Sequence, residues 1–161
     1  MVGRGLGCPS DALADLATAG LLHDVGKLAV PDHILTKPGP LDPEERQKVR
    51  IHPQVGAGII SGVPFPYPVA SIVLCHHERW DGRGYPAGLK GEAIPPVARA
   101  LSVADSYDAM TMDRPYRKGM PHGEAMRRLA AASGSQFDPA VVAAWEALHE
   151  VPPDFKYVAS W

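Results

Sequence analysis

The chain has 161 residues, 45% of them hydrophobic and 21% charged, which is enough for one domain that buries most of its apolar surface. The formal net charge of −2 excludes the broad basic field of a protein that binds nucleic acid polymers nonspecifically. Its apolar stretches are short or interrupted by proline, and its two cysteines show no disulfide spacing. We therefore expect no membrane span and a location in the reducing cytoplasm.

The first predicted helix covers residues 11–24 and ends in an acidic residue on its apolar face. The apolar stripe at positions 13, 17 and 20 continues to Asp24. A carboxylate on a buried face is costly unless it is paired or binds a metal, and His23 is its neighbour. Gly26 permits a tight exit from the helix, and Lys27 places a cation near Asp24. The alternative is a structural ion pair between Asp24 and Lys27 beside a surface histidine.

A turn-rich loop over residues 30–40 leads to a second helix with a clear start. The segment 42–45 combines an aspartate N-cap, a proline at the first helical position and a glutamate at capping-box spacing. Pro53 disfavours a helical conformation of the residue before it, so the helix should end near this point. His52 is therefore predicted at a hinge between two helices, where it binds a metal or simply caps a backbone carbonyl.

Two adjacent histidines, His76 and His77, close an apolar helical run over residues 69–75 and precede a glycine loop that extends to about Pro96. Neutral imidazole is a good ligand for Zn, Fe, Mn and Ni. The two rings leave the end of the helix about 100° apart, so they need not bind the same ion. A single histidine on an apolar stripe is more often a hydrogen-bonded core residue, so other parts of the chain must decide.

A further helix is predicted over about 97–112. Its apolar stripe comprises Val97, Leu101, Asp105, Asp108 and Met112. Asp105 interrupts this face, either as a metal ligand or in a structural pair with an arginine. Arg114 and Arg117 follow beside an aromatic residue, and their guanidinium forks suit phosphate oxygens if a metal site is near. Away from such a site, the cluster is only a solvated turn.

Two shorter helices close the domain, over about 122–133 and, behind an Asp138 cap, over 139–149. Their predicted core residues are Leu129, Val141, Val142, Trp145 and Leu148. Histidines outside the apolar stripes are interpreted as structural or exposed; these are His33, His122 and His149. Every convincing element is helical and none shows sustained strand alternation, so the predicted fold class is all-α.

Separate places in the chain put imidazoles and carboxylates where one buried site can gather them. They are His23 with Asp24, His52, His76 with His77, and Asp105. Mixed nitrogen and carboxylate ligation suits Fe, Mn or Zn more than Mg or Ca. Two such ions bridged by one carboxylate can hydrolyse a phosphate ester, because they activate a water and neutralise charge on phosphorus.

Four segments resemble the HD-GYP subfamily of HD-domain phosphohydrolases: His23 to Lys27, His52 with Pro53, HHERWDGRGYP at 76–86 and ADSYDAMTMDRPYRK at 104–118. The resemblance covers about residues 16–142. It implies an HD-domain helical bundle over residues 1–150, followed by a tail at 151–161. It also implies a cyclic-di-GMP phosphodiesterase of bacterial second-messenger signalling that forms pGpG and GMP, with two or three divalent ions. Fe or Mn is expected, and Zn or Ni are the alternatives.

Matched position by position, the resemblance assigns the metal ligands to His23, Asp24, His52, His76, His77 and Asp105. Asp24 is the bridging carboxylate and acts in catalysis together with Lys27. Two further groups contact substrate: Arg114 and Arg117 hold phosphate oxygens, and Gly84, Tyr85 and Pro86 shape a wall of the pocket. The same glycine loop is the expected contact for a partner such as a GGDEF-type diguanylate cyclase.

One departure from the family pattern concerns the N-terminus. Family members carry a preceding helix with a further histidine ligand, whereas Met1 to Leu22 contains no histidine. The resemblance thus predicts a bundle that lacks the usual first ligand-bearing helix. Either the chain is a fragment of a longer protein, with a sensor or receiver domain in the remainder, or the site is incomplete. Uncovered apolar surface should then promote association, for example as a homodimer. The alternative functions are an impaired module that binds cyclic-di-GMP or a cyclase, and a phosphohydrolase for another nucleotide.

Overall fold

The structure, a computed structural model, describes residues 10–66, 68–113 and 118–149. The helices are α2 (Ser10–Leu22), α3 (Asp32–Leu35), α4 (Pro43–Val49), α5 (His52–Ser61), α6 (Val69–Cys75), α7 (Pro96–Thr111), α8 (His122–Ala131) and α9 (Pro139–His149), with short 3-10 helices η1 (Val25–Ala29) and η2 (Gly91–Ala93). Within these ranges the only extended pairing is an isolated bridge between Ser133 and Phe137. The all-α fold class is confirmed. The tail at 151–161 lies outside the described residues.

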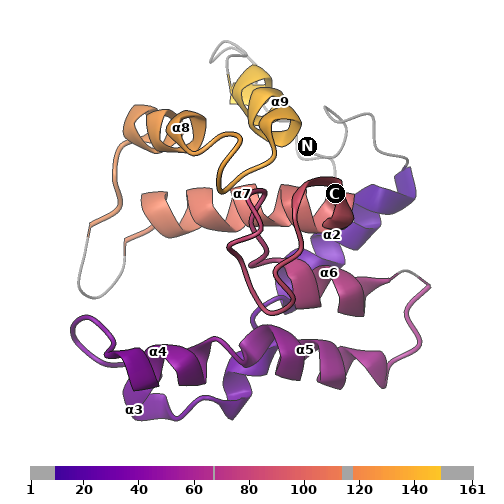
Figure 1. The fold of residues 1–161 in the computed structure, drawn as a ribbon, viewed down its shortest axis with the longest axis vertical. Coiled ribbons are helices and arrows are strands. Elements are labelled where there is room, and N and C mark those ends of the chain that lie inside the picture. The colour runs from indigo at the N-terminus through magenta and orange to yellow at the C-terminus, as the bar shows by residue number, and fades with distance from the viewer. Residues whose placement is uncertain (1–9, 67, 114–117, 150–161) are drawn as a thin grey trace, which may run out of the picture.

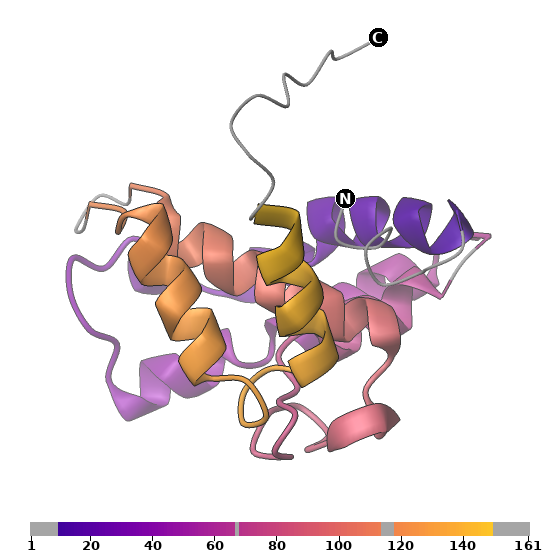
Figure 2. The same ribbon diagram turned by 90° about the horizontal axis from the view of Figure 1, so that it is seen from above.

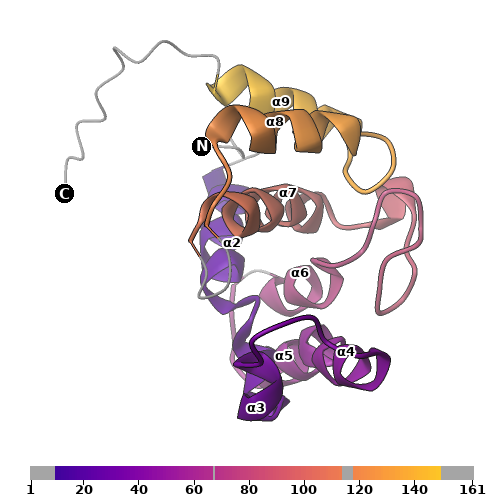
Figure 3. The same ribbon diagram turned by 90° about the vertical axis from the view of Figure 1, so that its left-hand side faces the viewer.

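Helix α7 runs through the middle of the molecule and is buried from two sides (Figures 1 and 3). It packs against α2 and α6 on one side and against α8 and α9 on the other. Figure 2 shows α8 and α9 side by side across α7. The buried residues of α7 are Ala98, Ala100, Leu101 and Val103, and they divide between two core clusters. The prediction of one apolar stripe along this helix is therefore wrong for its last two positions, because Asp108 and Met112 are exposed.

The start of α4 follows the sequence prediction. The Asp42 carboxylate accepts the backbone N–H of Glu45 at 2.8 Å, and the Glu45 carboxylate accepts the backbone N–H of Asp42 at 2.9 Å. Helix α4 ends at Val49 and α5 begins at His52, so the predicted break is present. His52 is the first residue of α5 rather than a hinge residue. Helix α3 lies within the segment that was predicted as a loop.

Helix α5 and the 3-10 helix η1 approach each other closely through their backbones. A Cβ atom on Gly26 would lie 1.9 Å from the backbone oxygen of His52 and 2.5 Å from the backbone nitrogen of Gly56. No side chain fits there, and Gly26 does not have a positive φ. Gly26 therefore serves this close contact and not the helix exit that the sequence suggested.

A few large apolar side chains face outward. Leu21 at the end of α2 is 87% exposed, and Leu28 in η1 is 82% exposed. None of the helices in the described ranges combines the length and the apolar character needed to cross a bilayer.

The glycine contact gives a first prediction. Gly26→Ala should lower the free energy of unfolding by about 3 kcal/mol, because the new methyl group meets rigid backbone. The matched control is Gly58→Ala within α5, where a Cβ would meet nothing within 4 Å. That control should raise stability by about 0.5–1 kcal/mol, because alanine is the better helix former. Urea denaturation measures the free energy of unfolding of both variants. An equal change in the two variants would contradict the close contact at Gly26.

Candidate metal centre

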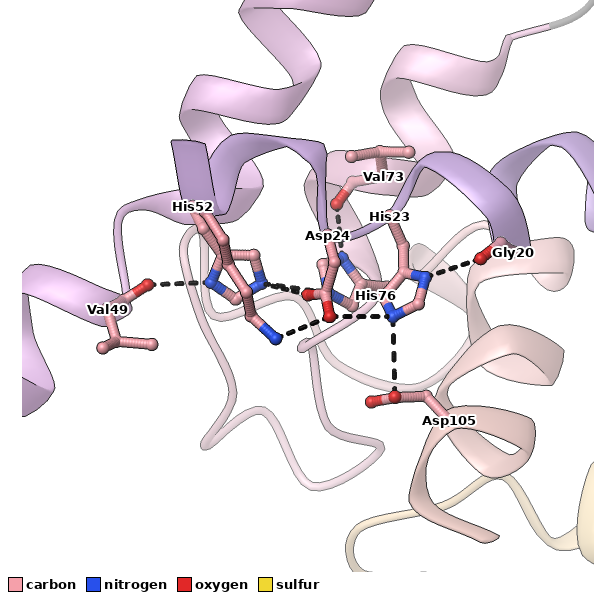
Figure 4. A network of polar contacts seen from close by, with 9 residues as sticks. Gly20, His23, Asp24, Val49, His52, Val73, His76 and Asp105 are labelled. Carbon is pink, nitrogen blue, oxygen red and sulfur yellow. Dashed lines mark hydrogen bonds and ion pairs between the residues drawn. The ribbon is translucent and has the colours of Figure 1, made fainter. Parts of the chain in front are cut away.

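All six residues predicted as metal ligands gather at one place between α2, α5, α6 and α7, and Figure 4 labels five of them: His23, Asp24, His52, His76 and Asp105. His23 Nε2 lies 3.5 Å from Asp24 Oδ2 and 3.5 Å from Asp105 Oδ1. His52 Nε2 lies 3.5 Å from Asp24 Oδ1 and 3.3 Å from His76 Nε2. The His77 ring centroid lies 4.1 Å from that of His76. The chain thus brings these side chains together, while their roles as ligands stay predictions.

Asp24 reaches the centre from a turn rather than from the face of a helix. Helix α2 ends at Leu22, and Asp24 is the N-cap residue of η1. Its side chain is 41% exposed, so the prediction of a carboxylate on a buried stripe is wrong. Lys27 Nζ donates to Asp24 Oδ2 at 2.5 Å, as the structural alternative required. His23, however, is no surface residue, because its side chain is 19% exposed.

The backbone fixes the orientation of three imidazoles. Nδ1 of His23 donates to Gly20 O at 2.8 Å, Nδ1 of His52 to Val49 O at 2.8 Å, and Nδ1 of His76 to Val73 O at 2.6 Å. Each acceptor is the carbonyl three residues earlier and lies in the last turn of α2, α4 or α6. Because Nδ1 carries the hydrogen, the lone pair of each neutral ring is on Nε2, which points into the centre.

A cation between the Nε2 lone pairs of His52 and His76 would be stabilised by both rings. The Nε2 atoms of His52 and His76 are 3.3 Å apart, and neither ring has a second hydrogen to donate while it is neutral. One ligand nitrogen from each of His52, His76 and His77 lies within 4.8 Å of the others. The donor set fits a divalent metal ion, and His76 and His77 are close enough to share one.

Burial keeps these imidazoles neutral at physiological pH. Desolvation lowers the pKa of His76 to about 4 and the pKa of His77 to about 3, and it also lowers the pKa of His52. The neutral form is the one that binds a metal. These three side chains are therefore ready to coordinate an ion without first losing a proton.

Around the two carboxylates of the centre, the pKa shifts favour the charged forms of the side chains. A hydrogen bond with Asp105 raises the pKa of His23 above its usual value. Desolvation acts to raise the pKa of Asp24, but the hydrogen bond and charge of Lys27, together with the charges of His23 and His52, outweigh it and the pKa falls. Asp105 likewise keeps a lowered pKa because His23 offsets its desolvation. Two ionised carboxylates thus face a point that attracts positive charge, which a metal ion can supply.

The glycine loop packs against this centre. The Tyr85 ring stacks on the His77 ring with centroids 4.9 Å apart and an interplanar angle of 24°. The guanidinium carbon of Arg50 lies 4.4 Å from the Tyr85 ring centroid. A Cβ atom on Gly84 would lie 2.4 Å from the backbone nitrogen of Arg79, so only glycine fits there. Of the predicted loop residues, Tyr85 contacts the centre through His77, whereas the substrate contacts of Gly84 and Pro86 stay predictions. Arg114 and Arg117 lie outside the described residues.

The match to known families agrees with this geometry. The family model described as "HD domain" matches residues 1–141. The chain belongs to the HD domain family. The resemblance predicted from the motifs is thereby confirmed at the level of the family and of its all-helical fold.

The relatives of this HD domain include proteins with assigned activities. It is 48% identical over 143 residues to a cyclic di-GMP phosphodiesterase of Pseudomonas aeruginosa and 42% identical over 146 residues to one of Thermotoga maritima. These matches cover 88% and 89% of this chain but only 34% and 40% of the relatives. A solved structure of a cyclic GMP-AMP specific phosphodiesterase of Vibrio cholerae matches with a TM-score of 0.69 at 25% identity, covering 94% of this chain and 41% of the other.

Glu78 is a residue of this HD domain that the sequence reasoning missed. It is 3% exposed, and its carboxylate accepts the backbone N–H groups of Ala87 at 2.7 Å, Gly88 at 3.1 Å and Leu89 at 3.0 Å. Glu78 thereby ties the far side of the glycine loop to the end of α6. No local sequence pattern indicated this role, because it depends on backbone N–H groups nine to eleven residues later in the loop.

The anchoring of the loop gives a second prediction. Glu78→Ala should lower the free energy of unfolding by about 3 kcal/mol, because three backbone donors lose a charged acceptor. Hydrogen exchange at Ala87, Gly88 and Leu89 should accelerate more than exchange elsewhere. The matched control is Glu92→Ala, an exposed glutamate later in the same connection. Unchanged exchange at these amides in the Glu78 variant would refute the anchoring role.

The histidine pKa values give a third prediction, for the metal-free chain. Between the unfolded value of 6.5 and the folded values of about 4 and about 3, the unfolded state binds more protons at His76 and His77. Stability should therefore fall as the pH drops through this window, although the raised pKa of His23 works in the opposite direction. The melting temperature in EDTA, followed by circular dichroism, measures this.

His77→Gln should weaken this pH dependence, because it removes one of the two strongly shifted groups. His33→Gln should leave it unchanged, because His33 is exposed. A melting temperature that stays constant between about pH 7 and pH 4 would be inconsistent with buried neutral imidazoles.

Proposed function

We propose that this HD domain is a metal-dependent phosphodiesterase that hydrolyses cyclic di-GMP to pGpG and onward to GMP. The observation that carries the proposal is the convergence of oriented imidazole nitrogens with two ionised carboxylates at one point. The names of the relatives in Pseudomonas aeruginosa and Thermotoga maritima support the substrate. The chain covers well under half of their length, so the substrate and activity are proposed for it and not carried over.

We infer two or three divalent ions, Fe or Mn with Zn or Ni as the alternatives, held by the six gathered residues. When bound, the ions supply Lewis-acid activation of the phosphodiester and of a water. Asp24 suits a bridging role because its two oxygens face different imidazoles: Oδ1 lies 3.5 Å from His52 and Oδ2 lies 3.5 Å from His23. Asp105 completes the other side of the centre.

Lys27 has two effects at this site. Its ammonium group keeps Asp24 deprotonated, and it places a positive charge next to the position where the phosphate must bind. The charge that develops on the phosphoryl oxygens in the transition state is stabilised there. Arg114 and Arg117 are proposed to hold the remaining phosphate oxygens, a role supported by their place in the motif.

The test of this function is Asp24→Asn, which keeps the shape of the side chain and removes its charge. Metal content measured by plasma mass spectrometry and cyclic di-GMP turnover should fall together, the latter by about 1,000-fold or more. Asp32→Asn is the matched control, because it removes an exposed aspartate in α3. Full hydrolysis by the Asp24 variant would overturn the proposed centre.

A second candidate is the hydrolysis of another cyclic dinucleotide. The Vibrio cholerae structure, described as cyclic GMP-AMP specific, favours it. A substrate panel separates the two candidates. An HD domain that binds metal and dinucleotide but turns over neither would be the impaired module. Contacts with a GGDEF-type cyclase through the glycine loop, a homodimer, and the division into residues 1–150 and a tail stay predictions.

A further inference from the structure

A cavity of about 360 Å³ lies between the α4–α5 junction and the glycine loop. Its lining includes Gln47, Arg50 and Gln54 on one side and Tyr85 and Pro86 on the other. This volume is in the range of small-molecule sites. Figure 1 shows the loop between α6 and α7 extending toward α4 and α5, which places the two walls opposite each other.

The cavity shares a wall with the metal centre. Tyr85 lines the cavity and stacks on His77, whose nitrogen belongs to the imidazole cluster. A nucleotide whose phosphate binds at the centre can therefore place its base in the adjoining cavity, beside this ring.

Arg50 presents donors to this cavity that the rest of the described chain leaves available. Its guanidinium group lies over the Tyr85 ring at 4.4 Å, and none of the ion pairs among the described residues involves it. Its backbone N–H bonds to Arg46 O at 3.0 Å at the end of α4, which fixes the position from which the side chain extends. Gln47 and Gln54 flank it three residues before and four residues after.

We propose that this cavity is a purine subsite and that Arg50 selects guanine over adenine; the inference rests on the proposed cyclic dinucleotide substrate. Guanine presents two acceptors side by side, O6 and N7, whereas adenine presents the N7 acceptor beside the N6 donor. Arginine carries only donors, so its fork pairs with both guanine atoms but with only one atom of adenine. The glutamine side chains offer both donors and acceptors to the remaining polar atoms of the base.

The subsite holds one base, which has a consequence for mixed dinucleotides. Cyclic di-GMP and 3'3'-cGAMP can each place a guanine in the cavity, whereas cyclic di-AMP cannot. Arg50 should therefore discriminate strongly against cyclic di-AMP and only weakly against 3'3'-cGAMP.

The test compares kcat/KM of the full chain for cyclic di-GMP, 3'3'-cGAMP, cyclic di-AMP and the base-free diester bis(p-nitrophenyl) phosphate. Arg50→Ala should reduce the preference for cyclic di-GMP over cyclic di-AMP by about 10-fold or more and leave the base-free diester unchanged. Arg50→Lys keeps the charge but loses the fork, so it should lose the preference as well. Arg50→Gln should shift the preference toward cyclic di-AMP, because the amide matches the adenine edge.

The matched control is Arg46→Ala, at a position within α4 one turn before Arg50. Arg46 is exposed and donates to Leu41 O at 2.8 Å rather than lining the cavity, so this variant removes the same charge without altering the preference. An equal loss for all four substrates in Arg50→Ala, or recovery of the preference in Arg50→Lys, would show a general electrostatic role and overturn the subsite. Equal effects of the two alanine variants would overturn it too.

A binding measurement separates this inference from the proposed function. Isothermal titration of the metal-free chain with GMP and with AMP should show tighter binding of GMP, and Arg50→Ala should remove the difference. If no cyclic dinucleotide is hydrolysed but this base preference is present, the proposed activity fails and the subsite stands. If cyclic di-GMP is hydrolysed but GMP and AMP bind equally, the activity stands and the subsite is overturned.

Discussion

The centre depends on one repeated hydrogen bond, from the Nδ1–H of a histidine to the carbonyl three residues earlier. His23, His52 and His76 each make this bond to a carbonyl in the final turn of a helix. Such carbonyls have no partner within their helix, so the imidazole satisfies a group that would otherwise need water. The same bond fixes which nitrogen faces inward. The negative ends of three helix dipoles also lie close to the point where the imidazole nitrogens meet, and they favour a cation there.

The candidate site could be predicted from the sequence because its predicted ligands interrupt apolar patterns. Asp105 was conspicuous as an acid on an apolar face, and it does lie 3.5 Å from His23. The end of α2 was not predictable in this way. Side-chain periodicity extended the helix to Asp24, but the chain leaves the helix at Leu22, where the His23 ring bonds back to Gly20. A count of apolar positions contains no information about a side chain that bonds to its own backbone.

The burial of α7 shows a second limit of sequence patterns. A helix between two layers has two apolar faces, and a search for one stripe joins positions from both. The capping box of Asp42 and Glu45 was predictable because it is purely local. Glu78 and Arg50 depend on contacts with loop residues that are distant along the chain, and no local pattern indicates where their side chains point.

The close contact at Gly26 also constrains the distance between the Asp24 carboxylate and the His52 ring. Gly26 is two residues from Asp24, and its backbone packs against the carbonyl of His52, so this contact holds the backbones that carry the carboxylate and the imidazole close together. Any shift of η1 relative to α5 would therefore also change the distance between the carboxylate of Asp24 and the ring of His52.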